Sequence, residues 1–90
     1  MKIHKLGDDG KDQIVRLAKK RRKDVAKIKE VIAFLVQGRK LDEKHKDHPL
    51  KSEFAEYREC HIEPDWLLIY KSQSSEIRFV RTGTHSDLFD

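Results

Sequence analysis

The apolar residues of this 90-residue chain change their spacing once, and that change limits the folds it can adopt. Between residues 11 and 36 they recur at helical spacing, whereas between residues 57 and 81 they follow the alternation and short runs of strands. A chain this short buries one small core, so residues 1–90 are predicted to form a single domain. We therefore expect one sheet covered by one helical layer.

The first half of the chain predicts a strand followed by a helix hairpin. Residues 2–6 indicate a short strand, and residues 7–10 a turn. One helix is predicted from residue 11 to about residue 21. A second follows, with Asp24 in its first turn, where a negative charge opposes the helix dipole, and it ends at Gly38. The short link between the helices predicts an antiparallel hairpin.

The second half predicts an irregular connection and then an antiparallel meander. Residues 39–53 are polar and contain Pro49, which breaks regular structure. Strands are predicted at residues 57–62, 66–71 and 77–81, joined by short turns. The middle segment is apolar on both faces, as expected of a central strand.

Strand alternation also predicts which side chains share a face. It places Arg81 on the same face as Ile77 and Phe79, at the end of an apolar stripe. A guanidinium there either reaches out to water or is aimed at a phosphate, which its planar fork fits. Alternation places Cys60 and His61 on opposite faces, which disfavours a Cys–His nucleophile pair.

Charge is distributed unevenly along the chain. Residues 1–40 carry 13 basic and 5 acidic residues, whereas residues 41–90 carry 7 and 11. The basic half contains five consecutive cations: Lys19, Lys20, Arg21, Arg22 and Lys23. Such a run either binds the phosphate backbone of RNA or an acidic partner, or is a solvated helix end and loop.

Cysteine content and apolar run length indicate the compartment. The single Cys60 rules out an internal disulfide, which fits a reducing cytosol. The amino-terminal residues contain no apolar core of signal-peptide length, and the longest apolar runs are far shorter than a membrane span. We expect a soluble cytoplasmic protein that has no membrane partner.

Three histidines lie in short polar motifs in the later part of the chain. His48 falls in a predicted loop, and His61 lies near a strand end, four residues before Asp65. His85 starts a helical turn predicted from the capping-box pattern of residues 84–87. Imidazole is well suited to move protons near neutral pH, although each histidine can also be read as an ordinary solvated residue.

Two aromatic residues are further candidates, and the sequence also bears on whether a metal is bound. Phe89 and Trp66 can each be a core residue or a plate on which a nucleic-acid base stacks. No histidine pair has a recognised zinc spacing, and Cys60 has no nearby thiol, so no metal or other cofactor is predicted. Metal-free acid–base chemistry with a cation remains, which suits phosphodiester cleavage by an RNA 2′-hydroxyl.

Residues 47–50, 57–70 and 81–89 strongly resemble the YafQ branch of the RelE/ParE toxin superfamily. These segments read DHPL, YRECHIEPDWLLIY and RTGTHSDLF, whereas residues 1–46 match only in layout. The resemblance implies a compact α+β fold of the RelE type. In that fold an amino-terminal strand and an antiparallel helix hairpin accompany a twisted antiparallel sheet, and the chain ends in a short helical turn.

The resemblance also implies a function and partners. It implies a type II toxin that is a ribosome-dependent endoribonuclease, cleaves mRNA in the decoding site and inhibits translation. The expected partners are the ribosome with its RNA, the mRNA, and a cognate antitoxin, which forms a hetero-oligomer with the otherwise monomeric toxin. One alternative is a non-catalytic ParE-like toxin of the same fold, against which the histidine set argues. A second alternative is an RNA- or protein-binding module.

Site residues follow position by position from the same resemblance. The family's active-site residues fall on His48, His61, Asp65, Arg81, His85 and Phe89. Glu59 fills the place of an acid that family members often have, and Trp66 is a further supporting candidate. The run from Lys19 to Lys23 lies where such toxins commonly contact ribosomal RNA.

Each of these residues has an expected role in cleavage. His85 would protonate the leaving oxygen, and His48 or His61 would accept the proton of the 2′-hydroxyl. Asp65 would orient a histidine, Arg81 would stabilise the charge on the phosphorane, and Phe89 would stack on a base or wedge it.

Overall fold

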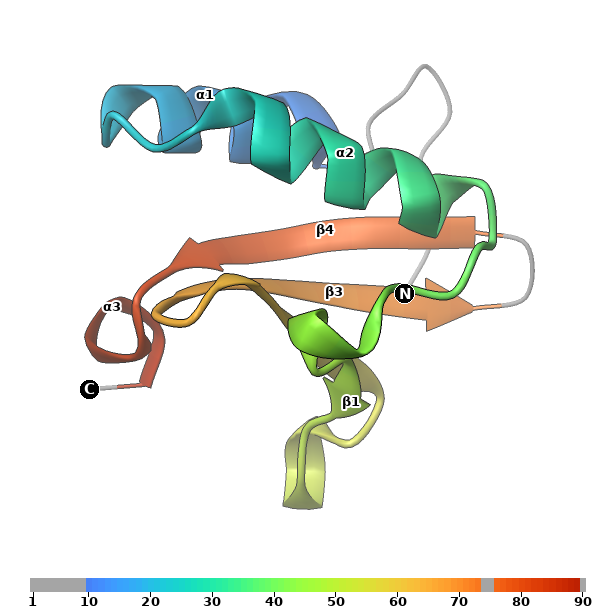
Figure 1. Cartoon of the computed structure of the whole chain (residues 1–90). Coiled ribbons are helices and arrows are strands. Elements are labelled where there is room, and N and C mark those ends of the chain that lie inside the picture. Colours follow the sequence, from blue (N-terminus) through green and yellow to red (C-terminus); the bar gives the residue numbers. More distant parts are fainter. Residues whose placement is uncertain (1–9, 74–75, 90) are drawn as a thin grey trace.

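A computed structural model describes residues 10–73 and 76–89, without the side chains of Glu53, Gln73 and Phe89. The strand predicted at residues 2–6 and most of the turn after it lie outside the described residues. Within the described part, four strands form one antiparallel sheet in the order β1-β2-β3-β4. Helices α1 and α2 lie side by side over one face of this sheet, as expected of an α+β fold with a single helical layer (Figure 1).

The predicted helix hairpin is confirmed by α1 (Lys11–Lys20) and α2 (Val25–Val36). Asp24 precedes α2 instead of lying in its first turn, and its side chain accepts a hydrogen bond from the Ala26 backbone N–H at 3.0 Å. Gly38 has a φ of 72°, the left-handed conformation that commonly ends a helix. No helix in the described residues is long and apolar enough to span a membrane.

The predicted meander is confirmed by β2 (Tyr57–Glu63), β3 (Trp66–Gln73) and β4 (Glu76–Gly83). The segment predicted to be irregular contains, in addition, the two-residue strand β1 (His48–Pro49), so the prediction that His48 lies in a loop is wrong. Two residues are too few to show a period, and Pro49 is tolerated because β1 is an edge strand. Short 3₁₀ turns flank β1, η1 (Glu43–His45) before it and η2 (Ser52–Phe54) after it.

The hydrophobic core lies between the hairpin and the sheet face that it covers. Trp66 of β3 is 1% exposed, and its indole N–H donates to the Thr82 hydroxyl at 2.9 Å. The core reading of Trp66 is therefore confirmed. The core also contains residues of both helices and of β2, β3 and β4: Ile14, Ala18, Ile28, Val31, Ile32, Cys60, Ile62, Leu68, Tyr70 and Phe79.

A bulge in β4 decides which side chains reach the face of the sheet that the helices leave uncovered. Phe79 pairs with Tyr70 and Arg81 pairs with Ile69, so Val80 is an extra residue between them. Paired residues in an antiparallel ladder point to the same face. Phe79 therefore points into the core and Arg81 to the opposite face. The prediction that they share a face is wrong, because strict alternation does not allow for the extra residue.

The chain turns after β4 into a short helix, α3 (His85–Phe89), as predicted. The Thr84 backbone N–H donates to the Asp87 carboxylate at 3.0 Å, and the Asp87 backbone N–H donates to the Thr84 hydroxyl at 3.1 Å. This reciprocal pair is the predicted capping box. His85 is the first residue of α3. The helix itself lies beside the end of β4 (Figure 1).

Candidate active site

A row of paired residues crosses the sheet on its helix-free face. His48 on β1 pairs with Glu59 on β2, Glu59 with Ile69 on β3, and Ile69 with Arg81 on β4. Neighbouring strands lie ~4.8 Å apart, so the backbone positions of this row span about 14 Å. His61, two residues beyond Glu59 on β2, points to the same face. The sheet thus gathers four of the predicted site residues on one surface.

Glu59 lies between two imidazoles. Its Oε1 is 3.7 Å from His48 Nε2 and 3.5 Å from His61 Nε2, and its side chain is 8% exposed. The Nδ1 atom of His48 is 2.7 Å from the Lys46 carbonyl, and that of His61 is 3.2 Å from the Pro64 carbonyl. A carbonyl oxygen only accepts, so each Nδ1 carries a hydrogen. The atom that remains to exchange a proton is Nε2 in both rings, and both face Glu59.

Asp65 binds His85. The His85 backbone N–H donates to Asp65 Oδ1 at 3.4 Å, and His85 Nδ1 lies 3.3 Å from the same oxygen. These hydrogen bonds hold the pKa of the Asp65 carboxyl below its usual range. The histidine that Asp65 contacts is therefore His85, whereas the neighbouring His61 is held by a backbone carbonyl.

The ring of His85 faces that of His61. Their centroids are 5.9 Å apart and their planes are inclined by 59°. One imidazole comes from β2 and the other from α3, so the fold joins two motifs that lie far apart in the sequence. Two histidines at this separation can act on opposite sides of a small reacting group.

Arg81 and Asp87 connect the site to α1. An N–H of the Arg81 guanidinium donates to the Asp87 carbonyl at 3.2 Å, and Arg21 Nη1 donates to the Asp87 carboxylate at 2.5 Å. The hydrogen bonds that Asp87 receives from Thr84, joined by the charge of Arg21, hold the pKa of the Asp87 carboxyl below its usual range. Short α3 is therefore held in place by both α1 and β4.

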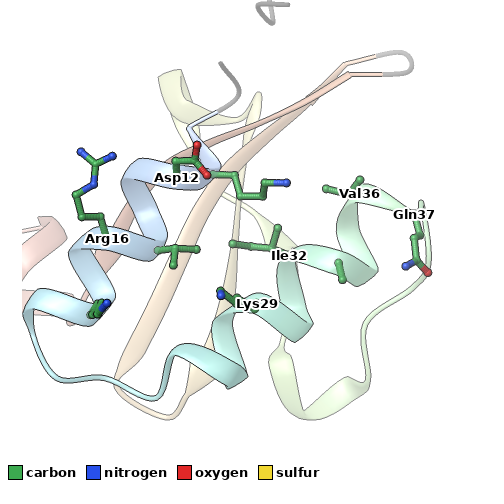
Figure 2. Close-up of a pocket in the computed structure, with 10 residues that line it drawn as sticks. Asp12, Arg16, Lys29, Ile32, Val36 and Gln37 are labelled. Carbon is green, nitrogen blue, oxygen red and sulfur yellow. The ribbon is translucent and has the colours of Figure 1, made fainter. Parts of the chain in front are cut away.

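Several hollows lie beside the helices in the described part of the chain, among them one lined by Arg81 and another lined by His61. A cleft of about 500 Å³ opens between α1, β4 and α3, and Lys20, Arg21 and Arg81 are among the residues that line it. This basic cleft suits an anionic ligand. A groove of about 660 Å³ between α1 and α2 is lined by residues of those helices, Ile32 and Val36 among them, and contains none of the histidines (Figure 2).

The other residues predicted for the site lie in the core, lie on the surface, or have a side chain outside the described part. Trp66 is buried on the helix-covered face and does not reach the histidines. The side chain of Phe89 lies outside the described part, so its stacking role stays a prediction. In the basic run, Lys23 Nζ lies 5.6 Å from the Trp66 ring centroid and Arg21 binds Asp87, while Lys19, Lys20 and Arg22 are exposed.

Sequence reasoning missed a partly buried network beside His48. The Asp47 carboxylate accepts hydrogen bonds from the Tyr70 hydroxyl at 2.7 Å and from Arg58 Nε at 3.0 Å. Asp47 stands in the DHPL segment, but its partners lie 11 and 23 residues further on. Such a contact has no periodic signal, and only the sheet register brings these residues together.

The described residues offer little support for a metal site or for a reactive thiol. No group of three or more His, Cys, Asp and Glu side chains there is arranged to hold a metal ion. Burial raises the pKa of the Cys60 thiol to about 12, which makes it a poor nucleophile near neutral pH. The acid–base groups on the helix-free face are therefore the groups with evident chemistry.

Comparisons with known proteins agree on one family. The model of a family described as the bacterial toxin of a type II toxin–antitoxin system, YafQ, matches residues 7–90. An Escherichia coli protein named mRNA interferase toxin YafQ is 48% identical over 88 residues, which are 97% of this chain and 94% of that protein.

Solved structures give the same result for the fold. The crystal structure of the E. coli DinJ–YafQ complex contains a chain with a TM-score of 0.79 and 46% identity, covering 88% of this chain and 89% of that one. A metal-bound toxin from Helicobacter pylori gives a TM-score of 0.75 at 36% identity, covering 87% and 89%.

Proposed function

Since this chain belongs to the YafQ family of type II toxins, we propose that it is an mRNA interferase that cuts mRNA in the decoding site of the ribosome. The E. coli relatives carry that name, and one of them is known in complex with DinJ. We propose likewise that a cognate antitoxin neutralises this chain by direct binding. Because its substrate is the mRNA on a translating ribosome, it acts in the cytoplasm.

The reaction that this site supports best is attack of an RNA 2′-hydroxyl on the adjacent phosphate. The new O2′–P bond forms as the P–O5′ bond breaks, leaving a cyclic phosphate and a free 5′-hydroxyl. One group must accept the 2′-proton and another must donate a proton to the departing 5′-oxygen. The observation that carries this proposal is the facing pair His61 and His85, each oriented through Nδ1 so that Nε2 exchanges the proton.

His61 is the base in this scheme, and His85 is the acid. Glu59 lies 3.5 Å from His61 Nε2 and stabilises the imidazolium that forms when the 2′-proton arrives. His48 approaches Glu59 from the other side and completes the proton-accepting cluster. Asp65 accepts a hydrogen bond from His85 Nδ1, so the charged ring presents its other proton, the one on Nε2, to the leaving oxygen.

Arg81 acts on the negative charge that develops at the reacting phosphate. A guanidinium stabilises the additional negative charge on the phosphorane, which develops as the 2′-oxygen attacks. Phe89 stacks on a base of the mRNA and helps to orient it. No metal takes part in these steps.

The test is cleavage of a defined mRNA on purified ribosomes, with the new 5′ ends mapped by sequencing. We expect cuts confined to the codon in the decoding site, with a 5′-hydroxyl and a cyclic phosphate at the new ends. The His85→Ala variant, which lacks the proposed general acid, is the control and should not cut. Arrest of translation with intact mRNA, or a DNA-damage response in cells, would instead support the non-catalytic alternative.

A further inference from the structure

His48 lies on an element that has little to hold it. Strand β1 has two residues, and its ladder with β2 contains only the pairs His48↔Glu59 and Pro49↔Arg58. Half of the His48 side chain is exposed to solvent. An isolated pairing this short is marginal in water, so contacts from outside the ladder must fix the position of His48.

Asp47 supplies those contacts from the other side of the sheet. Tyr70 is 3% exposed, lies in the core and pairs with Arg58 across β2 and β3. The Tyr70 hydroxyl is 2.7 Å from both Asp47 carboxylate oxygens, and Arg58 reaches Asp47 twice, from Nε at 3.0 Å and from Nη2 to the carbonyl at 3.4 Å. Consecutive residues of an extended chain point to opposite faces, so holding Asp47 on the core side directs His48 to the helix-free side.

We propose that Asp47, Tyr70 and Arg58 form a positioning network that holds His48 beside Glu59, which makes Asp47 and Tyr70 positioning residues for mRNA cleavage. This inference rests on the proposed function, in which His48 belongs to the proton-accepting cluster. The backbone on either side agrees with it. The Lys46 carbonyl accepts from His48 Nδ1 at 2.7 Å, and the Leu50 N–H donates to the Tyr57 carbonyl at 2.9 Å.

The network is also suited to remain unchanged near neutral pH. Burial and the hydrogen bond to Asp47 raise the pKa of the Tyr70 phenol, so its hydroxyl stays a donor. Arg58 stays charged at any pH at which the protein works. Both partners of Asp47 therefore keep their hydrogens while the imidazoles on the other face exchange theirs.

The experiment uses the full chain and three variants. Tyr70→Phe removes one hydroxyl and keeps the buried ring, and Asp47→Asn keeps the shape of the side chain but not its charge. Tyr57→Phe is the matched control, because Tyr57 is also a tyrosine of the sheet but points away from Tyr70 and Asp47, to the helix-free face. For each variant, kcat and KM for ribosome-bound mRNA are measured, together with the NMR signals of the His48 ring.

We expect Tyr70→Phe and Asp47→Asn to shift or broaden the His48 ring signals and to lower kcat roughly 10- to 100-fold, as small misplacements of catalytic groups do, with KM little changed. Tyr57→Phe should do neither. In a His48→Ala background, Tyr70→Phe should cause no further loss, because the group that it positions is already gone.

Two results would overturn the positioning role. One is unchanged His48 signals in folded Tyr70→Phe and Asp47→Asn proteins. The other is the same loss from Tyr70→Phe with and without His48, which would make the network a general support of the fold. If His48→Ala instead cuts mRNA as well as the wild type, the assigned role of His48 fails, while the NMR signals still decide whether the network positions its ring.

Discussion

Glu59 is the residue on which the proposed base depends. Its carboxylate is shielded from solvent and lies within 3.7 Å of two imidazole nitrogens. Replacing it by Gln keeps the size of the side chain and removes the charge that stabilises a protonated ring. We expect Glu59→Gln to lower kcat by roughly 10- to 100-fold, less than the ~10²–10⁴-fold worth of a proton-transfer residue itself. Single-turnover cleavage on ribosomes measures this, and an unchanged rate would remove Glu59 from the mechanism.

His85 carries the heaviest single role in the proposed reaction. Its backbone N–H contact with Asp65 and the Thr84–Asp87 cap of its helix do not involve the imidazole, so His85→Ala should leave the fold intact. We expect cleavage to fall by ~10²–10⁴-fold, the usual contribution of general acid catalysis. Antitoxin binding by the variant should remain and serves as the control for folding. A folded variant that cuts at nearly the wild-type rate would contradict the acid role.

The sequence identified these residues but not their contacts. His61, His85 and Asp65 are visible as polar residues in motifs, whereas the pairing of Asp65 with His85 depends on a turn and a helix folding against each other. Arg81 shows the limit most clearly. Because Val80 is one extra residue in β4, Arg81 points to the face opposite to the one that alternation predicts. The local sequence contains no signal that predicts this bulge.

At the scale of elements, α3 is a five-residue helix that depends on the carboxylate of Asp87. Because the pKa of this carboxyl is lowered in the folded protein, its contribution to stability is complete above its unfolded value of about 3.9. That contribution is lost as the pH falls through the lower, folded value. Asp65 has a shift of the same direction, so acid should weaken both contacts of the α3 region.

Asp87→Asn tests this dependence. We expect the variant to have a lower Tm than the wild type at pH 7 and the same Tm at a pH below the folded value, where the wild-type carboxyl is protonated too. The exposed neighbour Ser86, changed to Ala, is the control. Thermal unfolding followed by circular dichroism across pH gives the result, and a Tm difference that persists in acid would show that charge is not what matters.

The basic run at the end of α1 is now divided into two groups. Arg21 and Lys23 contact Asp87 and Trp66, so replacing them would disturb the fold as well as the surface. Lys19, Lys20 and Arg22 are exposed, and replacing them by Gln should change stability by less than about 0.5 kcal/mol each. If the run contacts ribosomal RNA, this triple variant should bind ribosomes more weakly and with a shallower dependence on salt, because fewer counterions are released.

The measurement is ribosome affinity at several salt concentrations. Cleavage by the ribosome-bound triple variant should proceed at nearly the wild-type rate, because none of the three residues lies among the histidines. Equal affinity and equal salt slope for variant and wild type would identify the run as solvated surface.

The elements themselves were largely predictable, and the reason is their periodicity. Both hairpin helices and the strands β2, β3 and β4 carry patterns long enough to read. Strand β1 has none, although it carries the candidate residue His48, and Asp47 just before it contacts Tyr70 and Arg58 far along the chain. The parts that local sequence could not supply are those determined by tertiary contacts.

At the scale of the whole molecule, the proposed chemistry needs proton transfer and positive charge but no metal. A relative from H. pylori is nevertheless known in a metal-bound form, which makes the question worth a direct test. We expect toxin that has been treated with chelator and dialysed to cut mRNA at an unchanged rate once the ribosome's Mg²⁺ is restored. Stoichiometric zinc or copper in the purified protein, with activity lost on its removal and regained on its return, would contradict metal-free cleavage.

The two faces of the sheet have different tasks: one packs against the hairpin and forms the core, and the other carries the histidines. This has a consequence for genetics. When cells are forced to overproduce the toxin without its antitoxin, the survivors carry mutations that abolish killing. Those that still yield full-length, folded protein should change residues of the helix-free face and α3, whereas substitutions at core positions such as Ile28 or Leu68 should be recovered as degraded chains. The spectrum of escape mutants would then trace the two sides of a single sheet.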